Sequence, residues 1–477
     1  MLHEELLKNK NGLLVSALAG TGKTTFLINY ALNNPNLKIL YTALNDSVIK
    51  EAREKFPKNV NCYTMHSIAY QNIGYKYKHK LSSYININRV SDYLLFTGFK
   101  KYFKTNEILS LLNSFCYSEY DDFERFLPKD YNSKFFSRKK AVALLNILWK
   151  KMIDKENDFP ITHDVYLKLY QLSNKGFPYL SYDLIMLDET QDSNDCIKSI
   201  ILTQKDIYNN KTILVGDPYQ YIYGFRGSVN IFEDLVFDKS FEKIRLTKTF
   251  RFGKKIEEIT NILLKNVLKS DFLIEGNENI NDSTNDIDYT KKYTVITRTN
   301  ASLIGYAINS IKNNKKIYFL GKNNINFDRA KDIYFLKNNE KNKIKSKKIK
   351  IYKNYKEFKK ESIENNIVED IFLIKVIEKY KDNFLNYINS FSKNTVQHHS
   401  QADIILTTVH TAKGLEFDQV VLGNDYYSIF DKNKKIKQNI NKEEVNIIYT
   451  AVTRAKYKLK LNNELKNIKT YYEQEKI

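Results

Sequence analysis

Two closely spaced glycines followed by a lysine and a threonine form the group of residues best suited to bind a phosphate chain. Gly20, Gly22, Lys23 and Thr24 come directly after an apolar stretch, residues 13–17, that predicts a β-strand. Glycines let the backbone approach phosphate, the lysine ammonium reaches the terminal phosphates, and the threonine hydroxyl can ligate Mg²⁺. A helix predicted to begin at Lys23 adds the positive end of its dipole. The pattern predicts a P-loop and a nucleoside triphosphate site.

The predicted nucleotide-binding segment extends to both sides of this Gly-Lys-Thr core. Ala17 stands where the general P-loop pattern has its first glycine, so the strand, the turn and the helix carry the prediction together. A chance turn that contains glycine is the alternative. The residues predicted to contact the nucleotide are Ala19, Gly20, Thr21, Gly22, Lys23, Thr24 and Thr25.

Two adjacent carboxylates follow a second apolar stretch. Residues 183–187 predict a strand that delivers Asp188 and Glu189 to its carboxyl end. Magnesium-assisted hydrolysis of a phosphoanhydride needs one acidic group near the metal and another that polarises the attacking water. Downstream of a P-loop, Asp188 suits the first role and Glu189 the second, whereas the same pair alone would indicate a solvated turn. Thr24 and Asp188 are therefore the predicted Mg²⁺ ligands.

Predicted strands alternate with predicted helices along the first half of the chain. This alternation is typical of an α/β fold, in which helices cover both faces of a parallel sheet. Between Tyr75 and Ser137 the pattern changes to Tyr-, Phe- and Lys-rich segments of mostly helical period, which predict an inserted helical subdomain. The predicted strands are residues 13–17, 38–42, 60–63, 183–187 and 212–215, and a helix is predicted at 46–56.

The second half shows the same alternation, beginning near Leu246. Residues 271–290 are polar and predict a loop, and residues 337–360 are dense in lysine and asparagine. A solvated face or a mobile linker is the default interpretation of such a run, and a phosphate-binding surface is the alternative. The predicted elements here are helices at 254–268 and 443–456, strands at 293–297 and 403–408, and helical periodicity between 358 and 390.

The composition favours a polyanionic partner inside the cell. The 477 residues carry a formal net charge of +21 and a pI of about 9.3, and phosphate neutralisation with counterion release makes nucleic acid the leading candidate. A codon bias toward lysine, asparagine, isoleucine and tyrosine is the competing explanation. Three scattered cysteines indicate neither a zinc module nor a disulfide framework. Without an apolar run of membrane-spanning length or a signal-like start, we expect a soluble intracellular protein and no membrane partner.

The motifs, taken together and in order, resemble those of superfamily 1 DNA helicases of the UvrD/Rep type. Individually each is a moderate signal, but the set covers nearly the whole chain. The helicase part of the eukaryotic F-box DNA helicases is particularly similar at residues 217–218, 250–253 and 451–456. The motifs are the P-loop, Thr-Met-His-Ser at 64–67, Asp-Glu-Thr-Gln-Asp at 188–192, residues 215–227, Phe-Arg at 250–251, residues 410–418 and Thr-Arg-Ala at 453–455.

The resemblance implies two RecA-like P-loop NTPase domains with inserted helical subdomains. The first would comprise residues 1–74 and 138–245, with a helical insertion at 75–137. The second would comprise residues 246–336 and 403–477, with a reduced insertion at 337–402. ATP would bind in the cleft between the two domains, and single-stranded DNA would lie across them.

The resemblance also assigns roles around ATP, which the local chemistry supports. Gln220 would sense the γ-phosphate, and Arg251 and Arg454 would place positive charge on the transferring phosphate. Phe250 would stack on the adenine and Glu416 would hold the ribose. With Lys23, Asp188 and Glu189, these residues form the predicted catalytic and cofactor-binding set for ATP and Mg²⁺.

On the DNA side, the matching positions are Thr64, His66, Phe225, Arg226 and His410. Aromatic and guanidinium groups interleaved on the loop after Gly216 suit stacking against unpaired bases. For the two histidines a structural role in a loop or core is the alternative. The chain departs from the family pattern at Leu6, where an adenine-reading glutamine is usual, and at Leu44, where an aromatic often contacts a base.

The sequence therefore predicts an ATP-dependent helicase and translocase on single-stranded DNA and at junctions with duplex DNA. The family runs 3′ to 5′, and we expect that polarity by resemblance. The competing function is a DNA-binding ATPase module that holds or remodels nucleic acid without processive unwinding. Cytoplasm, nucleus and a viral replication site are all compatible with the sequence.

Overall fold

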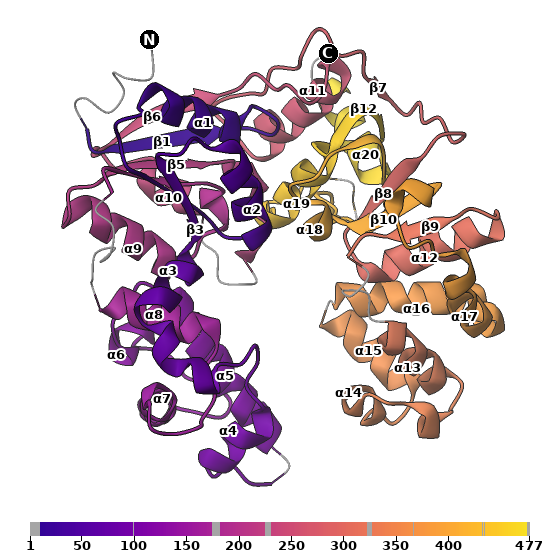
Figure 1. The fold of residues 1–477 in the computed structure, drawn as a ribbon. Helices are drawn as coiled ribbons and strands as arrows, with labels where there is room; N and C mark the ends of the chain where they lie inside the picture. The colour runs from indigo at the N-terminus through magenta and orange to yellow at the C-terminus, as the bar shows by residue number, and fades with distance from the viewer. Residues whose placement is uncertain are drawn as a thin grey trace. The chain divides into compact units, whose positions relative to one another are not determined.

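The protein consists of two compact units, each built on a six-stranded sheet (Figure 1). The computed structural model describes residues 10–98, 100–173, 182–224, 230–321, 327–365, 367–431, 433 and 435–474. Unit 1 comprises Met1–Leu18 and Gly22–Leu246, and unit 2 comprises Ala19–Thr21 and Thr247–Ile477.

All strands of the unit 1 sheet are parallel, in the order β3-β2-β4-β5-β1-β6. β1 lies between two strands from much later in the chain, since Gly12 pairs with Thr212 of β5 and with Phe241 of β6. Because the strands are parallel, all their carboxyl ends meet at one edge. The strands are β1 Gly12–Ala17, β2 Ile39–Ala43, β3 Val60–Thr64, β4 Leu184–Leu187, β5 Lys211–Gly216 and β6 Phe241–Leu246.

Helices cover both faces of this sheet because successive strand residues point to opposite sides. Leu13 and Val15 of β1 belong to the core formed with α1 (Lys23–Asn33) and α2 (Asp46–Lys55). Leu14 belongs to the core on the other face, where the helices are α3 Met65–Asn72, α9 Asp195–Asp206 and α10 Ile231–Leu235. The near-continuous apolar strands are those of a parallel sheet buried on both sides.

The chain between β3 and β4 is helical and shares the second of these cores. Aromatic rings dominate its interior, with Phe115 in contact with both Phe123 and Trp149. Its elements are the 3₁₀ helix Gly74–Lys80, α4 Ile87–Tyr93, α5 Lys101–Tyr117, α6 Phe123–Phe126, α7 Arg138–Ile153 and α8 His163–Leu172.

Unit 2 repeats the architecture with a second parallel sheet, in the order β7-β12-β11-β8-β10-β9. The strands are β7 Ser283–Thr284, β8 Tyr293–Thr297, β9 Ile317–Phe319, β10 Ile404–Thr408, β11 Phe417–Leu422 and β12 Ala455–Lys460. The helices outside its lysine-rich part are α11 Lys254–Ile262, continued by the π-helical turn Leu263–Val267, α12 Asn300–Lys312, α18 Val409–Ala412, α19 Lys442–Val452 and α20 Asn463–Gln474. Two parallel α/β units with additional helices confirm the predicted fold class.

The predicted helix 443–456 is wrong at its carboxyl end. Helix α19 stops at Val452, Thr453 and Arg454 form a turn, and Ala455 begins β12. In β12, Ala455 and Leu459 are buried among more exposed lysines. This short polar segment forms a strand because it pairs with β11 and β7. The periodicity of the segment itself gives no information about partners so far away in the sequence.

The lysine-rich run at 337–360 is folded, so its interpretation as a mobile linker is wrong. Three apolar residues interspersed among the lysines, Ile344, Ile349 and Phe358, are buried in the core of unit 2. The lysines themselves lie mainly on the outside, as a solvated face requires. The elements of this region are α13 Phe327–Lys337, the 3₁₀ turn Lys341–Lys343, α14 Lys347–Lys350, α15 Tyr355–Glu364, α16 Val368–Tyr380 and α17 Phe384–Asn394.

Among the described residues, the structure contains no helix both long and apolar enough to cross a bilayer.

If the lysine-rich run is held by its apolar residues, Phe358→Ala should lower the free energy of unfolding of unit 2 by about 3–5 kcal/mol, as buried aromatic truncations do. Denaturant titration of the whole chain would measure the loss. Ile351→Ala is the matched control, because Ile351 lies in the same run and is 70% exposed. Its effect should stay within about 0.5 kcal/mol. Equal and small effects of both substitutions would contradict the folded assignment.

Candidate functional site

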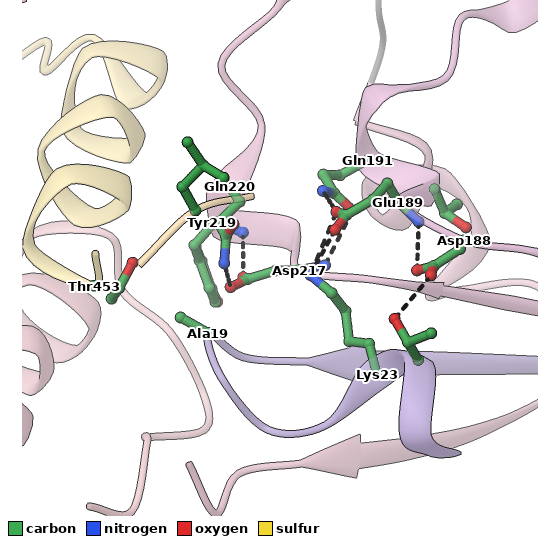
Figure 2. A network of polar contacts seen from close by, with 12 residues as sticks. Ala19, Lys23, Asp188, Glu189, Gln191, Asp217, Tyr219, Gln220 and Thr453 are labelled. Atoms are coloured by element: carbon green, nitrogen blue, oxygen red, sulfur yellow. Dashed lines mark hydrogen bonds and ion pairs between the residues drawn. The ribbon is translucent and has the colours of Figure 1, made fainter. Parts of the chain in front are cut away.

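Three strands of unit 1 deliver the predicted phosphate chemistry to the carboxyl edge of the sheet. β1 leads through the P-loop into α1 and Lys23. Asp188 directly follows β4, and Asp217 directly follows β5. Figure 2 shows the side chains that converge there. The Lys23 ammonium lies 3.3 Å from each carboxylate oxygen of Glu189, and the Thr24 hydroxyl lies 3.4 Å from Asp188 Oδ2. The structure thus brings four predicted site residues of unit 1 together.

The turn into α1 depends on Gly22. This residue caps the helix with φ +82°, a left-handed conformation that side chains with a Cβ disfavour. The helix begins at Lys23, as the sequence predicts, and its first turn contains no acidic residue. The free N–H groups and the positive end of the helix dipole therefore remain available for an external anion.

Asp188 is almost completely buried, at 3% exposure, and its carboxylate accepts several hydrogen bonds. The Tyr41 hydroxyl donates to Oδ2 over 2.9 Å, and the backbone N–H of Glu189 donates to Oδ1 over 2.8 Å. Burial raises the pKa of Asp188, and the charge of Glu189 raises it further, while Lys23 and the Tyr41 hydrogen bond oppose the shift. Burial and Asp188 also raise the pKa of Tyr41, so its hydroxyl stays protonated and remains a donor.

Lys23 is the cation that offsets this acidic group. Burial lowers the pKa of its ammonium, but the carboxylates of Glu189, Asp217 and Asp188 outweigh burial, and the net shift is upward. Lys23 therefore stays charged in a site where only 14% of its side chain is exposed. A permanently charged lysine beside a helix N-terminus is suited to bind phosphate.

Glu189 is held in an uncommon backbone conformation, with φ +50° and ψ 43°. For a residue with a Cβ this costs on the order of 1 kcal/mol. The amide of the buried Gln191 side chain donates to the Glu189 carboxylate and accepts a hydrogen bond from the backbone N–H of Asp217. Gln220, the predicted γ-phosphate sensor, donates over 2.7 Å to Asp217 Oδ2.

Sequence reasoning gave Tyr41 and Gln191 no role. Tyr41 lies within the mostly apolar strand β2, and Gln191 lies within the acidic motif that follows β4. Both contacts depend on tertiary structure, so only the motif around Gln191 gives a sequence signal.

The oxygen ligands in this site fit Mg²⁺ held jointly with a phosphate chain. Thr24 and Asp188 offer a hydroxyl and a carboxylate, and Mg²⁺ in nucleotide sites is held by one or two such protein groups together with phosphate oxygens. Across the described ranges, no cluster of three or more His, Cys, Asp or Glu side chains could hold a metal by itself. The residues therefore suit a metal that arrives with its nucleotide.

The predicted residues of unit 2 form a second cluster. Arg251 Nε donates to Glu416 over 2.9 Å, and its Nη1 donates to the carbonyl of Thr453 over 3.0 Å. Arg454 is buried, with Nε bonded to the Thr450 carbonyl. Its Nη1 donates to the carbonyl of Leu415, next to Glu416. Unit 2 thus brings Arg251, Glu416 and Arg454 close together.

Of the remaining predicted nucleotide contacts, Phe250 and Thr25 are exposed, whereas Ala19 and Thr21 are buried. Phe250 presents a ring that is 64% exposed, and its backbone N–H donates to the carbonyl of Gly20 within unit 2. Ala19 and Thr21 belong to the same unit, where the Ala19 N–H donates to the Tyr449 hydroxyl. Thr25, one residue beyond the predicted metal ligand, points to solvent.

The predicted DNA contacts follow strand ends in both units. Thr64 ends β3, is buried, and caps α3 by accepting the Ser67 N–H. His66 lies 3.2 Å from Asp164 of α8. His410 lies in α18, directly after β10. Phe225 and Arg226 lie outside the described residues.

A parallel sheet with a P-loop after one strand and an acidic pair after another defines the first unit as a P-loop nucleoside triphosphatase domain. The second unit adds another sheet of the same kind. The chain belongs to the UvrD/REP helicase family: residues 3–242 match the UvrD/REP helicase N-terminal domain, and residues 403–461 match the UvrD-like helicase C-terminal domain.

Comparison with individual proteins supports this family assignment. The chain is 30% identical to F-box DNA helicase protein 1 of Schizosaccharomyces pombe, over 95% of this chain and 56% of that protein. It is 31% identical to F-box DNA helicase 1 of Gallus gallus, over 95% of this chain and 47% of that protein. Gabija protein GajB of Bacillus cereus is 27% identical over 55% of this chain and 48% of its own length. The chain spans about half the length of these relatives.

If the Tyr41 hydroxyl stabilises Asp188 in unit 1, Tyr41→Phe should lower the free energy of unfolding by about 1.5–3 kcal/mol, the usual range for a hydrogen bond to a charged group. Phenylalanine fills the same volume, so denaturant titration isolates the hydrogen bond. Tyr84→Phe, at a tyrosine that is largely exposed, serves as the control and should change little. An unaltered stability of Tyr41→Phe would show that the contact contributes nothing.

Proposed function

We propose that this protein is an ATP-dependent DNA helicase and translocase that moves 3′ to 5′ along single-stranded DNA. ATP hydrolysis would be coupled to unwinding of duplex DNA or to displacement of bound proteins. The observation that carries the proposal is the convergence of Lys23, Thr24, Asp188 and Glu189 at one sheet edge. Membership of the UvrD/REP helicase family supports ATP as the nucleotide and DNA as the track.

In this proposal the residues of unit 1 divide the work of hydrolysis. Lys23 binds the terminal phosphates, and Thr24 and Asp188 hold Mg²⁺, which when bound supplies charge neutralisation on the phosphate oxygens. Glu189 orients the attacking water and accepts its proton. Gln220 reports on the γ-phosphate through Asp217, to which it is hydrogen bonded.

Unit 2 supplies positive charge and nucleotide recognition in the same proposal. Arg251 and Arg454 act on the transferring phosphoryl group, where an arginine is worth several orders of magnitude in rate in related phosphoryl transfers. The exposed Phe250 ring stacks on adenine, and Glu416 holds the ribose. The ion pair between Arg251 and Glu416 supports this assignment because it fixes both side chains in one place.

The DNA track is assigned to residues at the carboxyl ends of strands. Thr64 ends β3, His66 follows β3, and His410 follows β10, where open parallel sheets bind ligands. The formal charge of +21 supports a polyanionic track.

If Glu189 activates water, Glu189→Gln should keep ATP affinity within a few-fold of the parent while hydrolysis falls by about a hundredfold or more. Single-turnover hydrolysis and titration with a fluorescent ATP analogue measure the two quantities separately. Glu54→Gln is the control, because Glu54 is exposed on α2 and should leave both unchanged. Turnover within a few-fold of the parent in Glu189→Gln would refute the assignment.

A strand-displacement assay tests the wider proposal. Duplexes with a 3′ single-stranded tail should be unwound in the presence of ATP and Mg²⁺, whereas duplexes with a 5′ tail should not. Hydrolysis should also be strongly stimulated by single-stranded DNA. Stimulated hydrolysis without displacement of either substrate would favour the alternative, a DNA-binding ATPase module that remodels nucleic acid without processive unwinding. Displacement from the 5′ tail alone would overturn the polarity.

A further inference from the structure

Gln191 is fully buried beside the predicted general base, yet the proposed reaction gives it no role. Its side-chain amide bridges two segments of unit 1. Nε2 donates to the Glu189 carboxylate, and Oε1 accepts the backbone N–H of Asp217 over 3.1 Å, as Figure 2 shows. The bridge connects Glu189, the residue that would activate water, with the end of β5, and the two residues of the second hydrogen bond, Gln191 and Asp217, are 26 positions apart in the chain.

The orientation of this amide follows from the chemistry of its partners. A backbone N–H can only donate, so the atom of Gln191 facing Asp217 must be the oxygen. The NH₂ group then faces Glu189, whose carboxylate can only accept when ionised. The flipped amide would set a donor against a donor and an acceptor against an acceptor. Gln191 is therefore restricted to one orientation, in which it holds the Glu189 carboxylate.

Gly216, the last residue of β5, has no side chain, and the Gln191 amide occupies the space that a side chain would fill. A Cβ at Gly216 would lie 2.2 Å from Gln191 Oε1, far inside any normal contact. The same Cβ would meet the backbone N of Thr190 at 3.1 Å. A glycine at this position is thus required for the amide to approach the end of β5.

Gln191 and Lys23 both contact the Glu189 carboxylate, but only Lys23 is expected to change partners during the proposed reaction. Lys23 would have to turn toward the phosphates in the proposed reaction, which loosens its pair with Glu189. The amide of Gln191 has no such second task, because its oxygen is fixed on Asp217. The Glu189 carboxylate consequently keeps a neutral donor, which does not remove its charge.

We propose that Gln191 is a positioning residue that orients the Glu189 carboxylate for proton transfer, and that Gly216 provides the space it needs. The inference rests on the proposed function. In the step concerned, the water oxygen bonds to the γ-phosphorus and the bond to the bridging β–γ oxygen breaks. The proton of the water passes to Glu189, and ADP and phosphate leave. Gln191 touches none of the reacting atoms and acts through Glu189.

Two substitutions of Gln191 separate positioning from folding. Gln191→Glu keeps an acceptor for the Asp217 N–H but removes the donor to Glu189, whereas Gln191→Leu removes both hydrogen bonds. Both should lower kcat for hydrolysis, by on the order of a hundredfold as expected for a misplaced catalytic group. Affinity for a fluorescent ATP analogue and KM should stay within about twofold. Gln171→Glu, at a buried glutamine of α8, controls for a general loss of stability and should leave kcat unchanged.

Gly216→Ala tests the same inference from the other side. The added methyl group would displace the amide, so kcat should fall as in the Gln191 variants, and a melting curve on the same preparation would confirm that the chain is folded. Gly305→Ala is the control, because a Cβ at Gly305 meets its nearest neighbour at an ordinary 3.4 Å.

A double-mutant cycle with Glu189→Gln decides between positioning and a merely structural role. If Gln191 acts through Glu189, then Gln191→Glu should cause no further loss of hydrolysis in the Glu189→Gln background. Independent, multiplying losses would overturn the positioning role while leaving the proposed function intact. Full activity of both Gln191 variants beside an inactive Glu189→Gln would do the same. An active Glu189→Gln would overturn both this inference and the role of Glu189 in the proposed function.

Discussion

Two neighbouring carboxylates at the sheet edge of unit 1, Asp188 buried and Glu189 partly exposed, determine which groups must surround them. Asp188 and Glu189 repel each other, and burial penalises the charge on Asp188. Three groups stabilise these carboxylates: a lysine from α1, a tyrosine hydroxyl from β2 and the amide of Gln191. These groups reach one place because β1, β2, β4 and β5 are parallel and adjacent in the sheet. The chemistry at the edge therefore depends on strand order as much as on the motifs.

The residues that carry charge at this edge were predictable from the sequence, whereas the residues that hold them were not. A glycine turn before Lys23 and an acidic pair after a strand are local patterns, and both lie where the pattern predicts. The Tyr41 hydroxyl meets Asp188 only because β2 and β4 pair in one register, across 147 positions of sequence. No local pattern contains that register. The conformation of Glu189 was likewise invisible, since left-handed backbone is usually signalled by glycine or asparagine.

Unit 2 shows where the interpretation of composition fails. Residues 337–360 contain many lysines and only a few apolar residues. The average polarity of this segment therefore suggests a solvated linker. Ile349 in α14 and Phe358 in α15 nevertheless bury their side chains from short helices, and Ile344 is buried just before α14. β12 escaped prediction for a related reason, because its lysines alternate with only two buried residues and the neighbouring strands decide its conformation.

The position of β1 between β5 and β6 also affects how the chain is made. β1 is synthesised about 200 residues before β5, its first partner in the sheet. At a translation rate of about 5–20 residues per second, this interval lasts on the order of ten to forty seconds. The apolar strand that precedes the P-loop stays without its neighbours for that time. The proposed nucleotide site is therefore among the last parts of unit 1 to be completed on the ribosome, although its first residues are among the earliest to emerge.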